Sequence, residues 1–381
     1  MNRNERIRGP KLILAVMCLS TLSACDDDDG GYGGEPLFPL DAAVLTPPDN
    51  PITDAKADLG ELLFFDPVLS TDGDVACATC HLPAFAYADG RALAVGVGGT
   101  GEGPARIPGA EFPNAGRNAP TLLNVAFNGL TEPGSSYDPA NAPMFWDHRI
   151  RGLEAQVLDP IRTPSEMLGS AVQPENAVQA AVDRINAISE YVDRFDDVFG
   201  PGGADETRLS HALATYVRTL VVRDSPFDRF MRGDTAALTA QQQRGMDVFE
   251  DADCAGCHNG PMLSDWSLKR LGVGPHPDGP MSDTGAGDFR FRSASLRNVE
   301  LTGPYMHDGS IGTLEEVIAY YATAESVHPG VSSIDIESQS MSASDRLALL
   351  SFLEALTDTG FDTTSPPSVP SGLPVPGAGT P

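Results

Sequence analysis

Hydrophobic residues recur at helical spacing in several stretches of the chain, whereas the alternation typical of strands is sparse. Residues 176–199 and 208–222 carry apolar side chains three or four positions apart, as one face of an amphipathic helix requires. A stripe of leucines predicts a closing helix near the end of the chain: Leu347, Leu350, Leu353 and Leu356. The pattern therefore predicts a mainly α-helical fold in which these stripes face the core.

Two shorter helical segments are alike and indicate an internal duplication. Gly60 to Phe65 precedes one Cys-x-x-Cys-His motif, and Gly245 to Phe249 precedes a second. Thr239 to Gln242 forms a capping box that begins the second helix. Each half of the chain thus has the order helix, loop, Cys-x-x-Cys-His.

The spacing of the two motifs predicts the domain organisation. Their histidines, His81 and His258, lie 177 positions apart, which leaves room for one domain each. We expect an N-terminal domain over residues 54–230 and a C-terminal domain over residues 231–362. The two would pack together, with extended loops rich in glycine and proline.

The N-terminal residues 1–25 have the pattern of an export signal with a lipobox. Basic residues precede the apolar run from Leu12 to Leu22, which is too short to span a bilayer, and Leu22-Ser23-Ala24-Cys25 ends the segment. Lipidation of Cys25 would tether a periplasmic protein to a bacterial membrane. The alternative is ordinary signal cleavage nearby, with Cys25 incidental.

Both ends of the remaining chain lack apolar periodicity. Residues 26–53 combine an acidic run with glycines and prolines and are expected to form a flexible tether. Residues 363–381 are rich in proline, serine, glycine and threonine and are expected to form a disordered tail.

Charge narrows the choice of partner. The 381-residue chain has a formal net charge of −28, which argues against nucleic-acid binding because that function needs a basic surface. An acidic surface favours a basic protein partner instead.

The cysteines predict two covalently bound haem c groups. Of six cysteines, Cys18 lies in the signal and Cys25 in the lipobox, and the other four form the two motifs: Cys77, Cys80, Cys254 and Cys257. In such a motif the two thiols add to the haem vinyl groups, and the adjoining histidine, His81 or His258, binds the iron. A redox dithiol or half a zinc site would not require a histidine after the second cysteine twice.

Two haems do not by themselves make an enzyme. Electron carriers close both irons with a sixth ligand, whereas peroxidases leave one iron open to peroxide. The chain has seven histidines, and none lies between His81 and His148. The first haem therefore lacks an obvious local distal imidazole, as an open site would.

From Leu59 to Leu356 the sequence resembles the bacterial dihaem cytochrome c peroxidase and MauG superfamily. The matching blocks occur in the same order as in that family. Besides the two haem motifs they are Leu63-Phe64-Phe65-Asp66, Gly116-Arg117-Asn118-Ala119-Pro120-Thr121, Phe145-Trp146-Asp147, Pro164-Ser165-Glu166-Met167, Leu296-Arg297-Asn298-Val299 and Pro304-Tyr305-Met306-His307-Asp308-Gly309.

The resemblance implies roles for residues around the first haem. Glu166 would exchange protons with bound hydrogen peroxide over the open face, Gln156 would orient the peroxide, and Pro160 would line the pocket. Trp146 would relay electrons between the haems, although a core anchor at a domain boundary is a compatible role.

The resemblance also implies sites near the second haem. The side chain of Asn118 and the carbonyls of Thr302 and Pro304 match an inter-haem Ca²⁺ site, since oxygen ligands suit that cation. Arg292 falls where the family places an arginine that faces a haem and balances a propionate.

Two departures favour the MauG-type members of the family. The position fourteen residues after His307, where the peroxidases have a methionine ligand, is Tyr321, with Tyr320 as the neighbouring alternative. A phenolate ligand would stabilise oxidised iron and lower the potential of the second haem. The loop from Gly96 to Gly116 contains no switchable histidine, so the first haem is expected to be open without prior reduction. His148 and an insertion at residues 128–142 depart further from the family pattern, without an assigned role.

The leading hypothesis is a MauG-like enzyme that reduces hydrogen peroxide at the N-terminal haem and oxidises a partner protein through the C-terminal haem. The alternatives are a cytochrome c peroxidase that takes electrons from a small donor protein, and a membrane-tethered electron carrier without enzyme activity.

Overall fold

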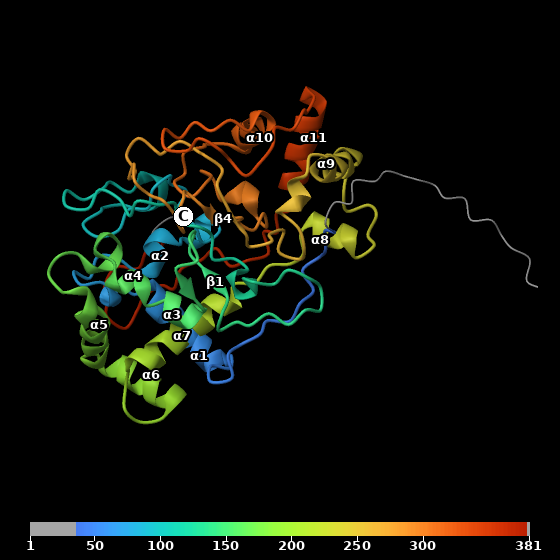
Figure 1. Ribbon diagram of the computed structural model, residues 1–381. Helices are drawn as coiled ribbons and strands as arrows, with labels where there is room; N and C mark the ends of the chain where they lie inside the picture. The colour runs from blue at the N-terminus through green and yellow to red at the C-terminus, as the bar shows by residue number, and fades with distance from the viewer. Residues whose placement is uncertain (1–35, 379–381) are drawn as a thin grey trace, which may run out of the picture. The chain divides into compact units, whose positions relative to one another are not determined.

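The computed structural model describes residues 36–378. The signal peptide, Cys25 of the lipobox and the first part of the expected tether lie outside the described residues. Helices are the main regular structure of the described chain, as expected (Figure 1). The α-helices are α1 (Asp54–Phe65), α2 (Cys77–Cys80), α3 (Leu153–Gln156), α4 (Asp159–Arg162), α5 (Ala177–Asn186), α6 (Ser189–Phe199), α7 (Glu206–Thr219), α8 (Pro226–Met231), α9 (Ala240–Asp251), α10 (Leu314–Thr323) and α11 (Ala343–Glu354).

Strands are short within the described residues. β1 (Pro143–Met144) pairs antiparallel with β2 (Ile150–Arg151), and β3 (Leu268–Lys269) pairs antiparallel with β4 (Phe291–Arg292). None of the described helices combines the length and the apolar composition needed to cross a bilayer.

The internal duplication appears as two similar helix pairs, α1 with α7 and α9 with α11. A Cβ atom at Gly60 in α1 would collide with the carbonyl oxygen of Ala212, and one at Gly245 in α9 would collide with that of Ala348. Each glycine therefore allows the helix before a Cys-x-x-Cys-His motif to cross its partner at close range. Figure 1 shows α1 and α7 in one half of the described chain and α9 and α11 in the other.

The hydrophobic core is divided in the same way. One large cluster is built from residues 59–222 with Val369, and a second from residues 227–356 with Leu37. A third, smaller cluster includes Phe127, Tyr137 of the insertion and Trp266 of the C-terminal half. This arrangement is consistent with two haem domains packed together.

Two predicted helical stripes are buried as expected over most of their length but differ from the structure in one respect each. The segment 176–199 is two helices, because Ile188 has extended backbone angles (φ −107°, ψ 109°) between α5 and α6. Both halves bury their apolar residues in the same cluster, so the spacing continues across the break. In α11 the predicted Leu347 is 60% exposed, whereas Leu349 and Phe352 are buried against α9 and its surroundings. Leu350, Leu353 and Leu356 pack in the same cluster as predicted, so Leu347 is the one residue of the stripe that faces solvent.

The expected tether is wrong for residues 36–53, which we call the N-terminal strap. Leu40 of the strap is fully buried, and its backbone N–H donates to the carboxylate of Asp228 at 3.0 Å. Asn50 is also buried and donates to the carboxylate of Glu154 at 2.8 Å. These contacts compensate for the entropy of ordering a segment without helix or strand.

The expected disordered tail is likewise wrong for residues 363–378, which we call the C-terminal tail. It returns to the N-terminal half, where Val369 joins the hydrophobic cluster. The hydroxyl of Ser371 donates to the buried carboxylate of Asp66 at 2.6 Å. Proline-rich composition excluded regular structure here, but it did not exclude packing.

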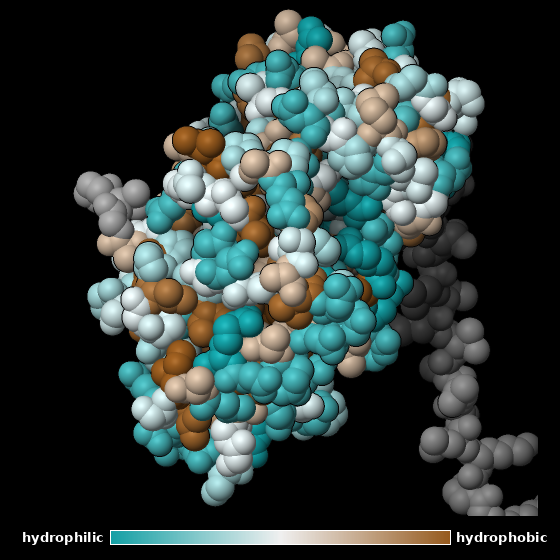
Figure 2. Space-filling model, turned by 90° about the vertical axis from the view of Figure 1, so that its left-hand side faces the viewer, coloured by the Kyte–Doolittle hydropathy of each residue, from teal (hydrophilic) through white to brown (hydrophobic). Residues whose placement is uncertain are grey.

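The surface in Figure 2 is mostly hydrophilic, and its hydrophobic residues are scattered in separate spots. Among the described residues the strongly exposed large hydrophobic side chains are few: Ile52, Ile107, Met281, Val327 and Leu347. The visible face therefore offers no broad apolar docking surface.

Candidate functional site

The first Cys-x-x-Cys-His motif forms the short helix α2, which follows α1 after a turn. Nδ1 of His81 lies 3.0 Å from the carbonyl oxygen of Tyr87. Since a carbonyl can only accept, Nδ1 carries the proton and Nε2 keeps its lone pair for a metal. Burial lowers the pKa of His81 to about 4, so the ring is neutral near pH 7.

The second motif repeats this arrangement on a 3₁₀ turn, Cys254–Gly256. Nδ1 of His258 donates to the carbonyl oxygen of Leu263 at 3.2 Å, and burial lowers the pKa of His258. The four cysteines of the two motifs are not bonded in disulfides. Both motifs therefore fit covalent haem c, with a neutral imidazole presented to each iron.

Glu166 lies next to the first motif, on a π-helical turn that spans Pro164–Leu168. Burial raises the pKa of Glu166 to about 7, and the nearby Arg149 acts in the opposite direction. Burial also raises the pKa of the Cys77 and Cys80 thiols, and the charge of Glu166 adds to that effect. A carboxyl group with a pKa raised to about 7 therefore lies close enough to the first motif to influence its thiols, and such a pKa suits a proton-transfer group.

The glycine-rich loop of residues 96–116 packs closely against the turn that carries Glu166. A Cβ atom at Gly96 would collide with the carbonyl oxygens of Ser165 and Glu166. Arg106 holds this loop from within, because its buried guanidinium donates to the carbonyls of Val95 at 2.8 Å, Gly96 at 2.8 Å and Gly101 at 2.9 Å. Sequence reasoning missed Arg106, whose only signal was a lone arginine among glycines.

The other residues predicted around the first haem lie on consecutive short helices. Gln156 ends α3 and Pro160 lies in α4, just before the turn of Glu166. Both side chains are half-buried. The chain therefore brings the three predicted residues into one helical run, although only Glu166 shows an electrostatic link to the first motif.

A cavity of about 520 Å³ lies beside the second motif. It is lined by Cys254, Cys257 and His258, and also by Tyr321 of α10. Tyr320 does not line it, and its hydroxyl instead donates to the carbonyl of Leu271 at 2.5 Å. The structure thus brings Tyr321, and not Tyr320, to the cavity of the second motif.

Other donor atoms line the same cavity. His328 is one, but its Nδ1 accepts from the backbone N–H of Gly330 at 3.0 Å. The proton of the neutral ring is therefore on Nε2, which removes the lone pair that an iron would need. Met341 is a further thioether donor on the cavity wall. Burial raises the pKa of Tyr321, so deprotonation of its phenol would require a bound cation.

Trp146 and Arg292 meet on the wall of this cavity. The indole N–H of Trp146 donates to the carbonyl of Asn118 at 3.0 Å. The guanidinium of Arg292 lies 5.7 Å from the Trp146 ring and 5.9 Å from that of Trp266. Burial lowers the pKa of Arg292 to about 10, and its Nε has no partner among the described residues. A buried cation on a cavity wall fits an anionic group such as a haem propionate.

Trp266 is a site residue that sequence reasoning missed. Its indole N–H donates to the carbonyl of Leu130 in the insertion at 3.1 Å. The insertion also supplies the buried Tyr137, which packs near Phe127. The insertion therefore anchors the second indole beside Arg292.

The residues of the expected Ca²⁺ site lie together. Asn118, Thr302 and Pro304 all line the cavity, and the amide nitrogen of Asn118 donates to the Pro304 carbonyl at 3.3 Å.

His148, which had no role assigned from the sequence, lies near Arg292. Burial lowers the pKa of His148 to about 4, and the positive charges of Arg292 and Arg151 act in the same direction. Its buried Nε2 has no partner among the described residues.

Known proteins are similar to this chain in sequence and in fold. Residues 54–236 match the family model described as di-haem cytochrome c peroxidase. The chain is 36% identical to the methylamine utilization protein MauG of Methylorubrum extorquens over 82% of this chain and 81% of that protein. It is 33% identical to the cytochrome c551 peroxidase of Pseudomonas aeruginosa, over 75% and 77% of the two chains. The crystal structure of a MauG-like protein associated with microbial copper homeostasis aligns with a TM-score of 0.67 and 28% identity, covering 84% of this chain and 94% of that one.

Proposed function

Because this chain belongs to the dihaem cytochrome c peroxidase family, which includes MauG, it is a peroxidase-type oxidoreductase with two c-type haems, and we propose that it acts in the MauG-like manner. Hydrogen peroxide would be reduced at the N-terminal haem, and a partner protein would be oxidised through the C-terminal haem. When bound, the two haems supply the redox chemistry, in which two electrons and two protons convert one peroxide into two waters.

Glu166 supplies the proton transfer in this proposal. As a carboxylate it would take one proton from hydrogen peroxide and would return it to the peroxide oxygen that leaves as water. Its pKa of about 7 allows both steps near neutral pH. Gln156 orients the peroxide by hydrogen bonding, and Pro160 helps to exclude water.

The single observation that carries the MauG-like assignment is Tyr321 on the wall of the cavity that holds His258. Tyr321 could supply an anionic phenolate to the second haem, which would stabilise oxidised iron more than a thioether would. The second haem would then hold an oxidising equivalent long enough for a protein partner to dock. Trp146, on the same cavity wall, would carry electrons between the two haems.

The charge, the signal sequence and the oxygen donors of the chain suggest its partner, its location and a Ca²⁺ site. With a net charge of −28 the chain suits a basic partner protein. We place the enzyme in the periplasm, held at a membrane by lipidated Cys25. Asn118, with the carbonyls of Thr302 and Pro304, would hold Ca²⁺ between the haems.

The decisive experiment is to add hydrogen peroxide to the fully oxidised holoenzyme without any reductant. We expect a near-infrared absorption band that persists after the peroxide is consumed, and decays when a partner protein is oxidised. The control is the same experiment after one-electron reduction. If the protein reacts with peroxide only after that reduction, it is an ordinary cytochrome c peroxidase. Two low-spin haems with no peroxide reaction in either state would indicate an electron carrier.

A further inference from the structure

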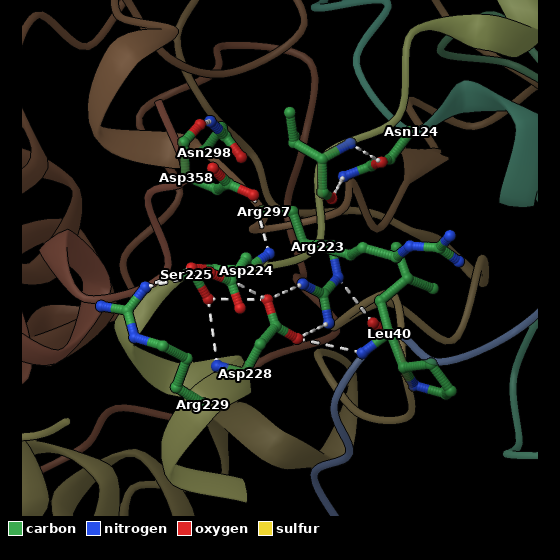
Figure 3. Close-up of polar contacts among 12 residues, drawn as sticks. Leu40, Asn124, Arg223, Asp224, Ser225, Asp228, Arg229, Arg297, Asn298 and Asp358 are labelled. Carbon is green, nitrogen blue, oxygen red and sulfur yellow. Dashed lines mark hydrogen bonds and ion pairs between the residues drawn. The ribbon is translucent and has the colours of Figure 1, made fainter. Parts of the chain in front are cut away.

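The motif Leu296-Arg297-Asn298-Val299 has no role in the proposed function. Its Arg297 nevertheless forms the most deeply buried ion pair of the described residues, with Asp228 (Figure 3). Arg297 and Asp228 are both buried, and the two nitrogens of the guanidinium fork donate to the two carboxylate oxygens at 2.9 and 3.0 Å. Asp228 also accepts from the hydroxyl of Ser225 at 2.7 Å and from the backbone N–H of Leu40 at 3.0 Å. The carboxylate is thus bonded from three separate parts of the chain.

The remaining nitrogen of Arg297 contacts the segment that follows the second haem motif. Its Nε donates to the carbonyl of Pro261 at 2.7 Å. Pro261 lies in the turn of residues 259–264, which follows His258 and ends near Leu263, the acceptor for His258 Nδ1. Leu263 has a left-handed backbone (φ 50°), which is unfavourable for a branched residue and needs external support.

Two other contacts hold the same turn. The hydroxyl of Ser295 donates to the carbonyl of Met262 at 2.7 Å. The backbone N–H of Gly260 donates to the carbonyl of Pro36 at 3.2 Å, at the beginning of the N-terminal strap. The strap therefore contacts both the turn and, through Leu40, the ion pair that supports it.

We infer that Arg297 and Asp228 are positioning residues for His258: they fix the turn whose Leu263 carbonyl accepts the hydrogen bond from His258 Nδ1. That hydrogen bond increases the electron donation of the imidazole to its iron and so favours the oxidised state. A looser turn weakens the hydrogen bond and raises the reduction potential of the second haem. The inference rests on haem binding at His258 and is independent of peroxide chemistry at the first haem.

The test compares Arg297→Lys and Ser295→Ala holoenzymes with the wild type by spectroelectrochemical titration. Lysine keeps a positive charge beside Asp228 but lacks the Nε–H that donates to the carbonyl of Pro261, and alanine removes the hydroxyl that donates to the carbonyl of Met262. For Arg297→Lys we expect the ratio of oxidised to reduced second haem at a fixed potential to fall about tenfold, a rise of about 59 mV for one electron. Ser295→Ala should give a smaller shift in the same direction, and the low-spin electron paramagnetic resonance signal of the second haem should change in both.

Matched controls separate positioning from general loss of stability. Arg218→Lys alters another ion pair, in which the buried Arg218 contacts the partly exposed Glu154 at 2.5 Å. Ser210→Ala removes another 2.7 Å hydrogen bond from a serine to a backbone carbonyl, that of Glu154. Both controls should lower stability without moving the potential of the second haem.

An unchanged second-haem potential in Arg297→Lys and Ser295→Ala, with haem content equal to wild type, overturns the inference. Equal shifts in the two controls overturn it as well, because the effect would then be general. Neither result bears on the proposed function, which fails if the fully oxidised wild-type holoenzyme does not react with peroxide.

Discussion

The guanidinium of Arg106 donates a 2.8 Å hydrogen bond to the carbonyl oxygen of Gly96, and Gly96 lies against the backbone of Ser165 and Glu166. The buried arginine and the glycine together hold the loop against the turn that presents the proposed catalytic carboxyl. The placement of Glu166 thus depends on contacts made seventy positions earlier in the chain.

Replacing Gly96 by alanine should therefore displace Glu166. The new methyl group collides with the carbonyls of Ser165 and Glu166, and a displacement near 1 Å slows a reaction by about 10²-fold. Stopped-flow measurement of peroxide consumption checks the rate. Gly312→Ala is the control, because its methyl group would meet only the flexible carboxylate of Glu316. Equal rates in both variants would show that the loop does not position Glu166.

The ionisation of Glu166 predicts a pH profile. Because its pKa is raised to about 7 and the carboxylate is the form that accepts a proton, the peroxide reaction should accelerate with pH and reach half its maximum near pH 7. Glu166→Gln should slow the reaction by about 10²-fold and abolish this dependence. A pH-independent wild-type rate would exclude Glu166 as the base.

The raised pKa of Glu166 also predicts how the stability of the folded protein depends on pH. The folded protein binds the Glu166 proton more tightly than the unfolded chain, so the contribution of Glu166 to stability is lost as the pH rises from about 4.5 to about 7. Glu166→Gln removes the buried charge and should unfold at a higher temperature than wild type above pH 7. At pH 4 the two proteins should differ little. Thermal melts followed by circular dichroism at both pH values measure the difference.

Tyr321 predicts the spectrum of the second haem. Tyr321→Phe removes the phenol from the cavity and should convert that haem to a five-coordinate, high-spin form with a raised reduction potential, because the anionic ligand is lost. Tyr320→Phe is the control, since Tyr320 donates to Leu271 and does not line the cavity. Optical and electron paramagnetic resonance spectra distinguish the forms. A low-spin second haem in Tyr321→Phe would direct attention to Met341.

The contact between the C-terminal tail and Asp66 is expected to contribute to the free energy of unfolding. Ser371→Ala removes a 2.6 Å hydrogen bond to buried Asp66, which should lower the free energy of unfolding by about 1–2 kcal/mol. Ser368 in the same tail is exposed, so Ser368→Ala should leave stability unchanged. Equilibrium denaturation of both variants provides the comparison.

The sequence alone was sufficient to predict those features that depend on residues close together in the chain. Each Cys-x-x-Cys-His motif sets the spacing of thiols and imidazole over five residues, and the box from Thr239 to Gln242 begins α9 as predicted. The repeated Gly60 and Gly245 also indicated the duplication, because a close helix crossing requires a residue without a side chain.

Long-range contacts were decided only by the tertiary structure. Nothing in the composition of the strap and the tail shows that Leu40 reaches Asp228 or that Ser371 reaches Asp66. Apolar spacing continues through the break at Ile188, so the pattern cannot reveal that break. Local sequence was enough to identify the haem-binding motifs and to propose which carboxyl group moves protons. The tertiary structure was needed to show which carbonyls and carboxylates, distant in the chain, hold these groups in place. Such contacts form when separate segments pack together, and no local pattern in either segment specifies the partner.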